Sequence, residues 1–103
     1  IMKKITDIAK QYVKSVKNSG MNISNAYLFG SYAKGNPRKG SDIDICIVSD
    51  QFGDDYIDEA VKLRVISFDI DNRIEPVPFT PLDLNDKYSS LASEIKKYGI
   101  SLI

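Results

Sequence analysis

Apolar residues recur along the chain at two different periods, and each period predicts a type of element. Over residues 3–18 they return every three or four positions and lysines take the other face, which predicts an amphipathic helix. The same spacing over residues 54–68 predicts a second helix, and a last helix is expected near residues 86–98. The apolar side of the first helix comprises Ile5, Ile8, Ala9, Tyr12, Val13 and Val16, and one side of the second carries Ile57, Ala60, Val61, Arg64, Val65 and Phe68.

Shorter segments show the features of strands. Residues 26–29 are mostly apolar and end at Gly30, and in "SDIDICIVS" Asp42, Asp44 and Cys46 alternate with isoleucines. This period of two predicts a strand whose isoleucine face turns toward the core. The segment "RIEPVPF" is expected to be extended and to lie at a sheet edge because of its prolines, and "GISLI" is expected to add a final short strand.

The order helix, strand, loop, strand, helix, strand, helix indicates an α/β or α+β fold of two layers. The 103 residues fit a single domain over 1–103. Apolar runs fall short of the roughly 18 residues of a membrane span, and the N-terminus lacks the apolar core of a signal peptide. Because the single cysteine, Cys46, excludes an internal disulfide framework, we expect a cytoplasmic protein without membrane contact.

Charge and histidine content limit the possible chemistry. Lysine plus arginine and aspartate plus glutamate each number 14, so no overall field favours nucleic acid, and we expect no direct nucleic-acid binding. The chain has no histidine, which excludes a histidine base and a histidine zinc site. Acid–base catalysis would have to use carboxylate, lysine, tyrosine or water, and a bound metal would be a hard cation held by oxygen.

Candidate chemistry gathers in one stretch, "FGSYAKGNPRKGSDIDICIV", residues 29–48. A strand that ends at Gly30 and enters a turn of small residues exposes backbone N–H groups, which can hold a phosphate, and Ser31 adds a hydroxyl. Asp42 and Asp44 lie on one face of the next strand with Cα atoms about 6.7 Å apart. Two carboxylates at this separation can share magnesium ions, and paired metals promote phosphoryl displacement.

Other interpretations of the stretch are weaker. A P-loop requires a lysine and a serine or threonine after Gly35, where Asn36 and Pro37 stand instead. Each feature alone is common turn chemistry, in which aspartates cap the next element. The ordered combination of glycine turn, basic loop and spaced aspartates favours a phosphate and metal site over a purely structural turn.

This stretch resembles the signature of the nucleotidyltransferase superfamily related to DNA polymerase beta, which consists of Gly-Ser, a variable loop, and Asp-x-Asp on a strand. The small size and the "GSxAxG…SDID" form are most similar to the minimal nucleotidyltransferases of prokaryotes. The resemblance is specific over residues 29–48 and looser to about residue 80. It implies the nucleotidyltransferase fold, a small mixed sheet packed against helices.

The resemblance also implies roles for individual residues at the nucleotide. Gly30 and Ser31 match the pair that holds the nucleotide triphosphate, and Lys34 and Ser41 are carried over as further nucleotide-binding residues. Tyr32 lies in the same loop, and two roles stay as alternatives for its side chain, packing or contact with the nucleotide.

In the same way, the resemblance assigns Asp42 and Asp44 as the first two metal carboxylates. The family has a third acid on a later strand, for which Glu75 is the best match and also a candidate general base. A rival pair, Asp69 and Asp71, is expected at the end of the second helix, where turn and capping roles are favoured.

The expected function follows from these assignments. The resemblance implies transfer of AMP from ATP, with two Mg²⁺ ions, to an acceptor hydroxyl. The acceptor that it implies is a tyrosine of a partner HEPN toxin, which would make the chain an antitoxin. Two alternatives stay open. One is a non-catalytic module that binds nucleotide or partner, raised by glutamate at position 75. The other is a small-molecule nucleotidyltransferase of the antibiotic-modifying kind, which would need a homo-oligomer to complete its cleft.

Overall fold

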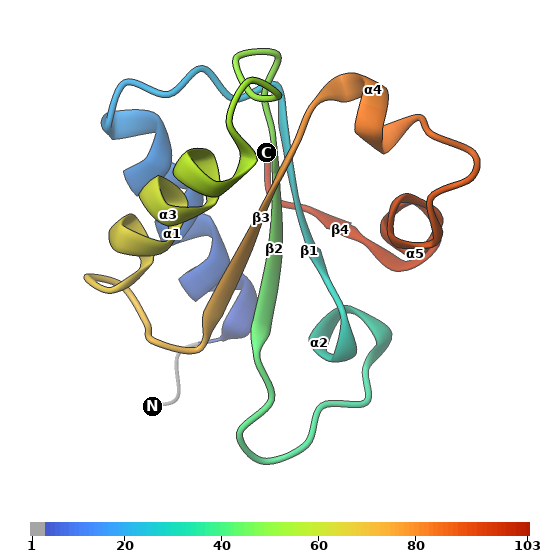
Figure 1. The fold of residues 1–103 in the computed structure, drawn as a ribbon. Helices are drawn as coiled ribbons and strands as arrows, with labels where there is room; N and C mark the ends of the chain where they lie inside the picture. Colours follow the sequence, from blue (N-terminus) through green and yellow to red (C-terminus); the bar gives the residue numbers. More distant parts are fainter. Residues whose placement is uncertain (1–3) are drawn as a thin grey trace.

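The computed structural model describes residues 4–103 and contains a mixed sheet of four strands in the order β3-β2-β1-β4 (Figure 1). Strand β1 (Asn25–Phe29) pairs antiparallel with β2 (Ile43–Val48) and β4 (Ile100–Ser101), and β3 (Ile74–Phe79) runs parallel to β2. The prolines of β3 correctly predicted its edge position. Within the described residues, no helix is long and apolar enough to cross a membrane.

Helices α1 (Ile5–Asn18) and α3 (Tyr56–Ser67) cover one face of the sheet (Figure 1). The isoleucines of β2 are completely buried on this face, as their alternation predicted. The Tyr12 hydroxyl, also fully buried, donates a hydrogen bond of 2.7 Å to the carbonyl oxygen of Leu63 and so ties α1 to α3. The predicted start of the first helix, at residue 3, lies outside the described residues.

The other face of β2 is also packed. Cys46 and Val48 are buried there together with Ala92 and Ile95 of α5 (Ser90–Tyr98). Figure 1 shows α5 on the side of the sheet opposite α1 and α3. The predicted α+β class is therefore confirmed, and α5 adds a further layer over the face that also carries Asp44.

The last helix begins later than the sequence indicated. A short helix, α4 (Pro81–Leu84), is followed by turns, and α5 starts only at Ser90, so the expected start near residue 86 is wrong. The cause is capping. Thr80 and Asp83 form a capping box that begins α4, and the Ser89 side chain accepts a hydrogen bond from the Ala92 N–H at the start of α5.

Helix α3 turns its predicted apolar side to solvent. Leu63 and Ser67 are completely buried against the sheet, whereas Ile57 is 74% exposed and Phe68 60% exposed. Asp55, at the position before the helix, caps it by accepting a hydrogen bond of 3.0 Å from the Asp58 N–H. This helix is apolar on both faces, so periodicity alone could not indicate which face packs inward.

Replacing Tyr12 with phenylalanine is expected to destabilise the protein by about 1–2 kcal/mol, because the ring stays buried while the hydrogen bond to Leu63 is lost. Urea unfolding measures the change. Tyr88→Phe is the control, since Tyr88 is 86% exposed and should show no loss. Equal stability of the two variants would contradict a structural role for the Tyr12 hydroxyl.

Candidate functional site

Gly30 ends β1 in a conformation that brings it directly against Asp44. Its φ of 76° lies in the left-handed region that favours glycine. A Cβ placed on Gly30 would overlap Oδ2 of Asp44 and lie 3.0 Å from its Cγ. The short helix α2 (Ser31–Lys34) begins at the next residue, so the first backbone N–H groups of α2 have no helical acceptor. Glycine is therefore required here by its backbone conformation and by the space that Asp44 occupies.

The sheet register brings the predicted carboxylates to one end of the molecule. Asp44 stands opposite Phe29 of β1 and opposite Glu75 of β3, with which it shares a face of the parallel pair. Asp42 lies immediately before β2 and is exposed, whereas Asp44 and Glu75 are partly buried. The structure thus places the three residues as neighbours, although Glu75 comes from a strand that follows β2 by more than twenty residues.

The environment of Asp44 disfavours its negative charge. Burial raises the pKa of Asp44 to about 6, and the negative charges of Asp42, Glu75 and Glu94 add to this rise. No cation is paired with Asp42 or Asp44 among the described residues. The charge of Asp42 acts through space on Arg64 and helps to raise the pKa of that guanidinium, but neither aspartate has a cation at ion-pair distance in the described part of the chain.

The other two acids in this cluster each have a cationic partner. Glu75 lies 2.7 Å from Nη1 of Arg64, which also donates a hydrogen bond of 3.3 Å to the Ile74 carbonyl oxygen at the sheet edge. Glu94 of α5 lies 2.7 Å from Nζ of Lys34. The predicted nucleotide contact Lys34 is thus engaged with Glu94 in this conformation.

The donor chemistry of this cluster suits a hard cation. All candidate ligands are carboxylate oxygens, the donors that magnesium and calcium prefer. Within the part of the chain that the structure describes, however, no three acidic or cysteine side chains are close enough together to hold a metal ion. Asp42 and Asp44 fit the expected role, whereas Glu75 would first have to leave Arg64.

The remaining candidates have structural contacts. The Ser41 hydroxyl accepts a hydrogen bond of 2.7 Å from the Arg38 N–H and closes the turn before β2. Tyr32 is partly buried and packs against the core. Asp71 accepts hydrogen bonds from the backbone and side chain of Arg73, which confirms its predicted turn role.

Two residues at this site were missed by sequence reasoning. Arg64 was assigned only to a helix side, and Glu94 received no role. Their signals are weak, because a lone arginine or glutamate on a helix is normally a solvated surface residue. Only the tertiary arrangement brings Arg64 to Glu75 and Glu94 to Lys34.

Comparison with known proteins defines the class. Residues 3–103 match the model of the family described as polymerase beta, nucleotidyltransferase. The chain belongs to this family. No sequence among the curated proteins matches it.

Solved structures share the fold. A Sulfolobus solfataricus protein, determined as a candidate nucleotidyltransferase, superposes with a TM-score of 0.68 at 22% identity, covering 94% of this chain and 78% of that one. A toxin–antitoxin structure with AMP-PNP gives 0.60 at 23% identity, covering 93% and 72%. A variant of the toxin–antitoxin pair MntA-HpeT gives 0.61 at 23% identity, covering 90% and 70%. At these identities the similarity establishes the fold.

Gly30→Ala is expected to cost more stability than Gly40→Ala. Both glycines have positive φ, so both substitutions should cost about 1–2 kcal/mol in backbone strain. An added Cβ meets nothing within 4 Å at Gly40 but overlaps Asp44 at Gly30, which should add about 1–3 kcal/mol. Urea unfolding measures both. In an Asp44→Ala background the excess cost of Gly30→Ala should fall to a small remainder, because only the Cβ of residue 44, 3.3 Å away, is left to contact. Equal costs in the native background would refute the close approach.

Asp44→Asn is expected to stabilise the protein at pH 7. The pKa of Asp44 is about 6 in the folded state and 3.8 for an ordinary aspartate, so the folded state binds more protons between these values and loses stability as the pH rises through them. Removing the charge should recover about 1–2 kcal/mol at pH 7, allowing for partial exposure, and almost nothing near pH 4. Unfolding at both pH values tests this, with exposed Asp69→Asn as the control. A variant no more stable than the native chain at pH 7 contradicts it.

Proposed function

We propose that this nucleotidyltransferase-family chain transfers AMP from ATP to a hydroxyl group of a partner protein in a Mg²⁺-dependent reaction. The observation that carries the proposal is the pair Asp42 and Asp44, neither of which has a cation at ion-pair distance among the described residues, with Asp44 directly beside the Gly30 turn. A cluster of acids in which two members lack cations is suited to a divalent ion. The neighbouring turn offers backbone N–H groups to phosphate oxygens.

The residues of the site have distinct roles in the proposed reaction. The Gly30–Ser31 turn binds the triphosphate through backbone N–H groups, and Ser31 adds its hydroxyl. Asp42 and Asp44 would hold the magnesium ions, which would supply positive charge against the charge that develops on the phosphoryl oxygens. Glu75, once free of Arg64, accepts the proton of the attacking hydroxyl. A bond forms between that oxygen and the α-phosphorus, and pyrophosphate leaves.

The proposed acceptor is a tyrosine of a partner toxin of the HEPN type. Support comes from similar structures that are toxin–antitoxin assemblies, one of them with AMP-PNP. Another carries glutamate in place of two aspartates two positions apart, the spacing of Asp42 and Asp44. The chain would then act as the antitoxin of such a pair.

One observation favours a second candidate function. Glu75 is paired with Arg64, and among the described residues no three acids are close enough together to hold a metal ion. A chain in which this pairing persists would bind its nucleotide or partner without transfer. Pyrophosphate release separates the two functions, because a binding module releases none.

Transfer is tested by incubating the chain with ATP labelled at the α-phosphate, Mg²⁺ and the protein encoded by the neighbouring gene. We expect labelled AMP on that protein, and a loss of about 100-fold or more for Asp44→Asn, because the reaction requires its charge. Asp69→Asn, a change at the exposed rival acid, should leave transfer intact. Undiminished transfer by Asp44→Asn would exclude the assignment.

Magnesium binding has a test that needs no transfer. Adding millimolar Mg²⁺ at pH 7.5 is expected to raise the melting temperature of the native chain, because a ligand that binds only the folded state stabilises it. Asp42→Asn and Asp44→Asn should each reduce the rise, and Asp69→Asn should keep it. The same rise in all four proteins would show that the aspartates hold no ion.

A further inference from the structure

The outer side of α3 presents a continuous apolar surface. Its members follow one another at helical spacing, and each is more than half exposed: Ile57, Val61, Val65 and Phe68. Three of the four are β-branched residues, which favour a helix less than the lysine or glutamate common on solvated faces. The sequence therefore gains no local stability from these residues, and a contiguous apolar surface of this kind is typical of an interaction site.

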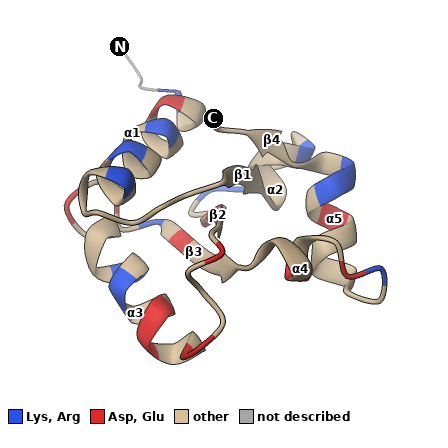
Figure 2. Cartoon of the chain, turned by 90° about the horizontal axis from the view of Figure 1, so that it is seen from above, with Lys and Arg blue, Asp and Glu red and all other residues tan. Residues whose placement is uncertain are grey.

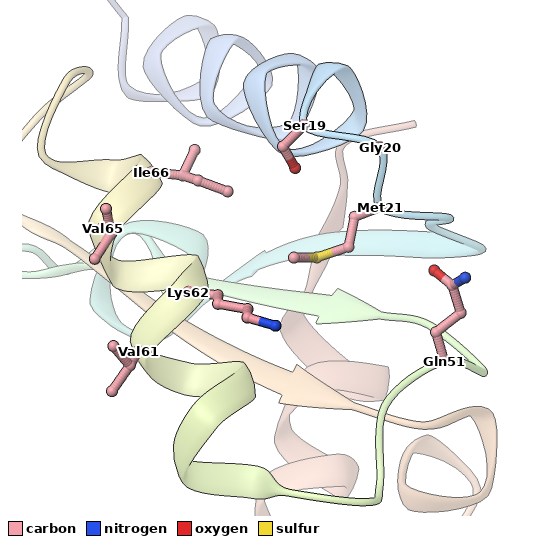
Figure 3. Close-up of a pocket in the computed structure, with 8 residues that line it drawn as sticks. All are labelled: Ser19, Gly20, Met21, Gln51, Val61, Lys62, Val65 and Ile66. Atoms are coloured by element: carbon pink, nitrogen blue, oxygen red, sulfur yellow. The ribbon is translucent and has the colours of Figure 1, made fainter.

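A groove runs beside this outer side. Its apolar part has a volume of about 490 Å³ and lies between α3, the end of α1 and Gln51. In Figure 3 the side chains of Met21 and Ile66 border this space, and Lys62 extends along it. Val65, which also lines the groove, lies toward the outer side of α3. A second hollow of about 300 Å³ continues the groove, since both share Met21, Gln51 and Lys62.

The continuation of the groove is acidic. It is lined by Asp54, Asp55, Asp58 and Glu59 at the start of α3. From Asp50 to Lys62 the chain has five acidic residues and a single cation, Lys62, which lies 3.2 Å from Asp58. Figure 2 shows the acidic residues at the beginning of α3 and in the loop before it. The groove thus changes from acidic to apolar along the helix.

This charge distribution disfavours a second copy as the occupant. A parallel pair of α3 helices would set the two acidic ends against each other. An antiparallel pair centred between Val61 and Val65 would set Asp58 opposite Phe68 and so bring it next to the exposed Asp69. Either arrangement puts like charges together, which opposes self-association.

We infer that the groove beside α3 docks an amphipathic helix of a partner protein, with an apolar face and lysine or arginine at one end. Apolar side chains at helical spacing fit the part lined by Met21 and Val65, and the basic end meets Asp54 and its neighbours. The inference deepens the proposed function, since a protein acceptor must be held. The inference depends on the proposed function only because a protein acceptor must be held, and its test involves no nucleotide.

The probe is a helix-stabilised synthetic peptide with leucines at three- and four-residue spacing and lysines at one end, matched by a peptide with glutamates in place of the lysines. Binding is measured by NMR titration of the full chain. We expect the lysine peptide to bind and to shift the α3 and Met21 signals, and the glutamate peptide to bind about tenfold more weakly.

Variants locate the site. Val65→Ser should weaken lysine-peptide binding about tenfold, because it removes an apolar contact from the groove. Asp54→Lys combined with Asp58→Lys should reverse the preference toward the glutamate peptide. Leu82→Ser, a change at an 84% exposed residue of α4, should have no effect.

Three results would overturn the inference. They are failure of the lysine peptide to bind, equal binding of both peptides, and binding that Val65→Ser does not weaken. Sedimentation provides a fourth, because a dimer that Val65→Ser dissociates would assign the surface to a second copy. If Asp44→Asn abolishes AMP transfer but leaves peptide binding intact, the docking groove and the transfer site act independently and each proposal is judged by its own test.

Discussion

The close approach of Gly30 to Asp44 is the constraint on which the rest of the site depends. It requires β1 to end at Phe29, a positive φ at Gly30, and the antiparallel register that sets Phe29 opposite Asp44. Asp44 keeps its direction because glycine leaves the neighbouring space empty. The parallel pairing of β2 with β3 then sets Glu75 beside it. Backbone conformation, strand register and charge placement are therefore linked at one position.

The charges at this end of the sheet oppose stability. Asp42, Glu75 and Glu94 all act on the charge of Asp44, and among the described residues Glu75 and Glu94 are the two of these four acids that have a cation at ion-pair distance. Asp44 is partly buried and next to like charges, so its ionised form is less favourable than that of an ordinary aspartate, and its pKa is raised to about 6. Fully buried Ile43 and Ile45 on either side of it anchor the strand in the core and offset this repulsion. The fold thus tolerates a charge arrangement that a purely structural strand would not need.

Local patterns predicted the parts of the site that lie within one stretch of sequence. The alternation in β2 placed Asp44 opposite to the isoleucines, because side-chain direction in a strand is a property of adjacent residues. The ion pairs of Lys34 with Glu94 and of Arg64 with Glu75 were not predicted, because tertiary packing brings their members together. Periodicity identified α3 but could not orient it, because both of its sides are apolar. The capping residues of α4 can be recognised in the sequence, but a helix of four residues is too short to show a hydrophobic period.

Helix α3 connects the proposed docking groove with the acidic cluster. Arg64 lies between the two, with its guanidinium 5.7 Å from the ring centre of exposed Phe68 and its Nη1 2.7 Å from Glu75. A partner that covers Phe68 removes water from Arg64, which strengthens the attraction between Arg64 and Glu75. In the reaction proposed above, Glu75 would act as a base once another acceptor takes its place on the guanidinium. On the proposed role of Glu75, a partner that is also the substrate would bring an oxygen acceptor to Arg64, whereas a partner without one would leave Glu75 paired and be bound without reaction.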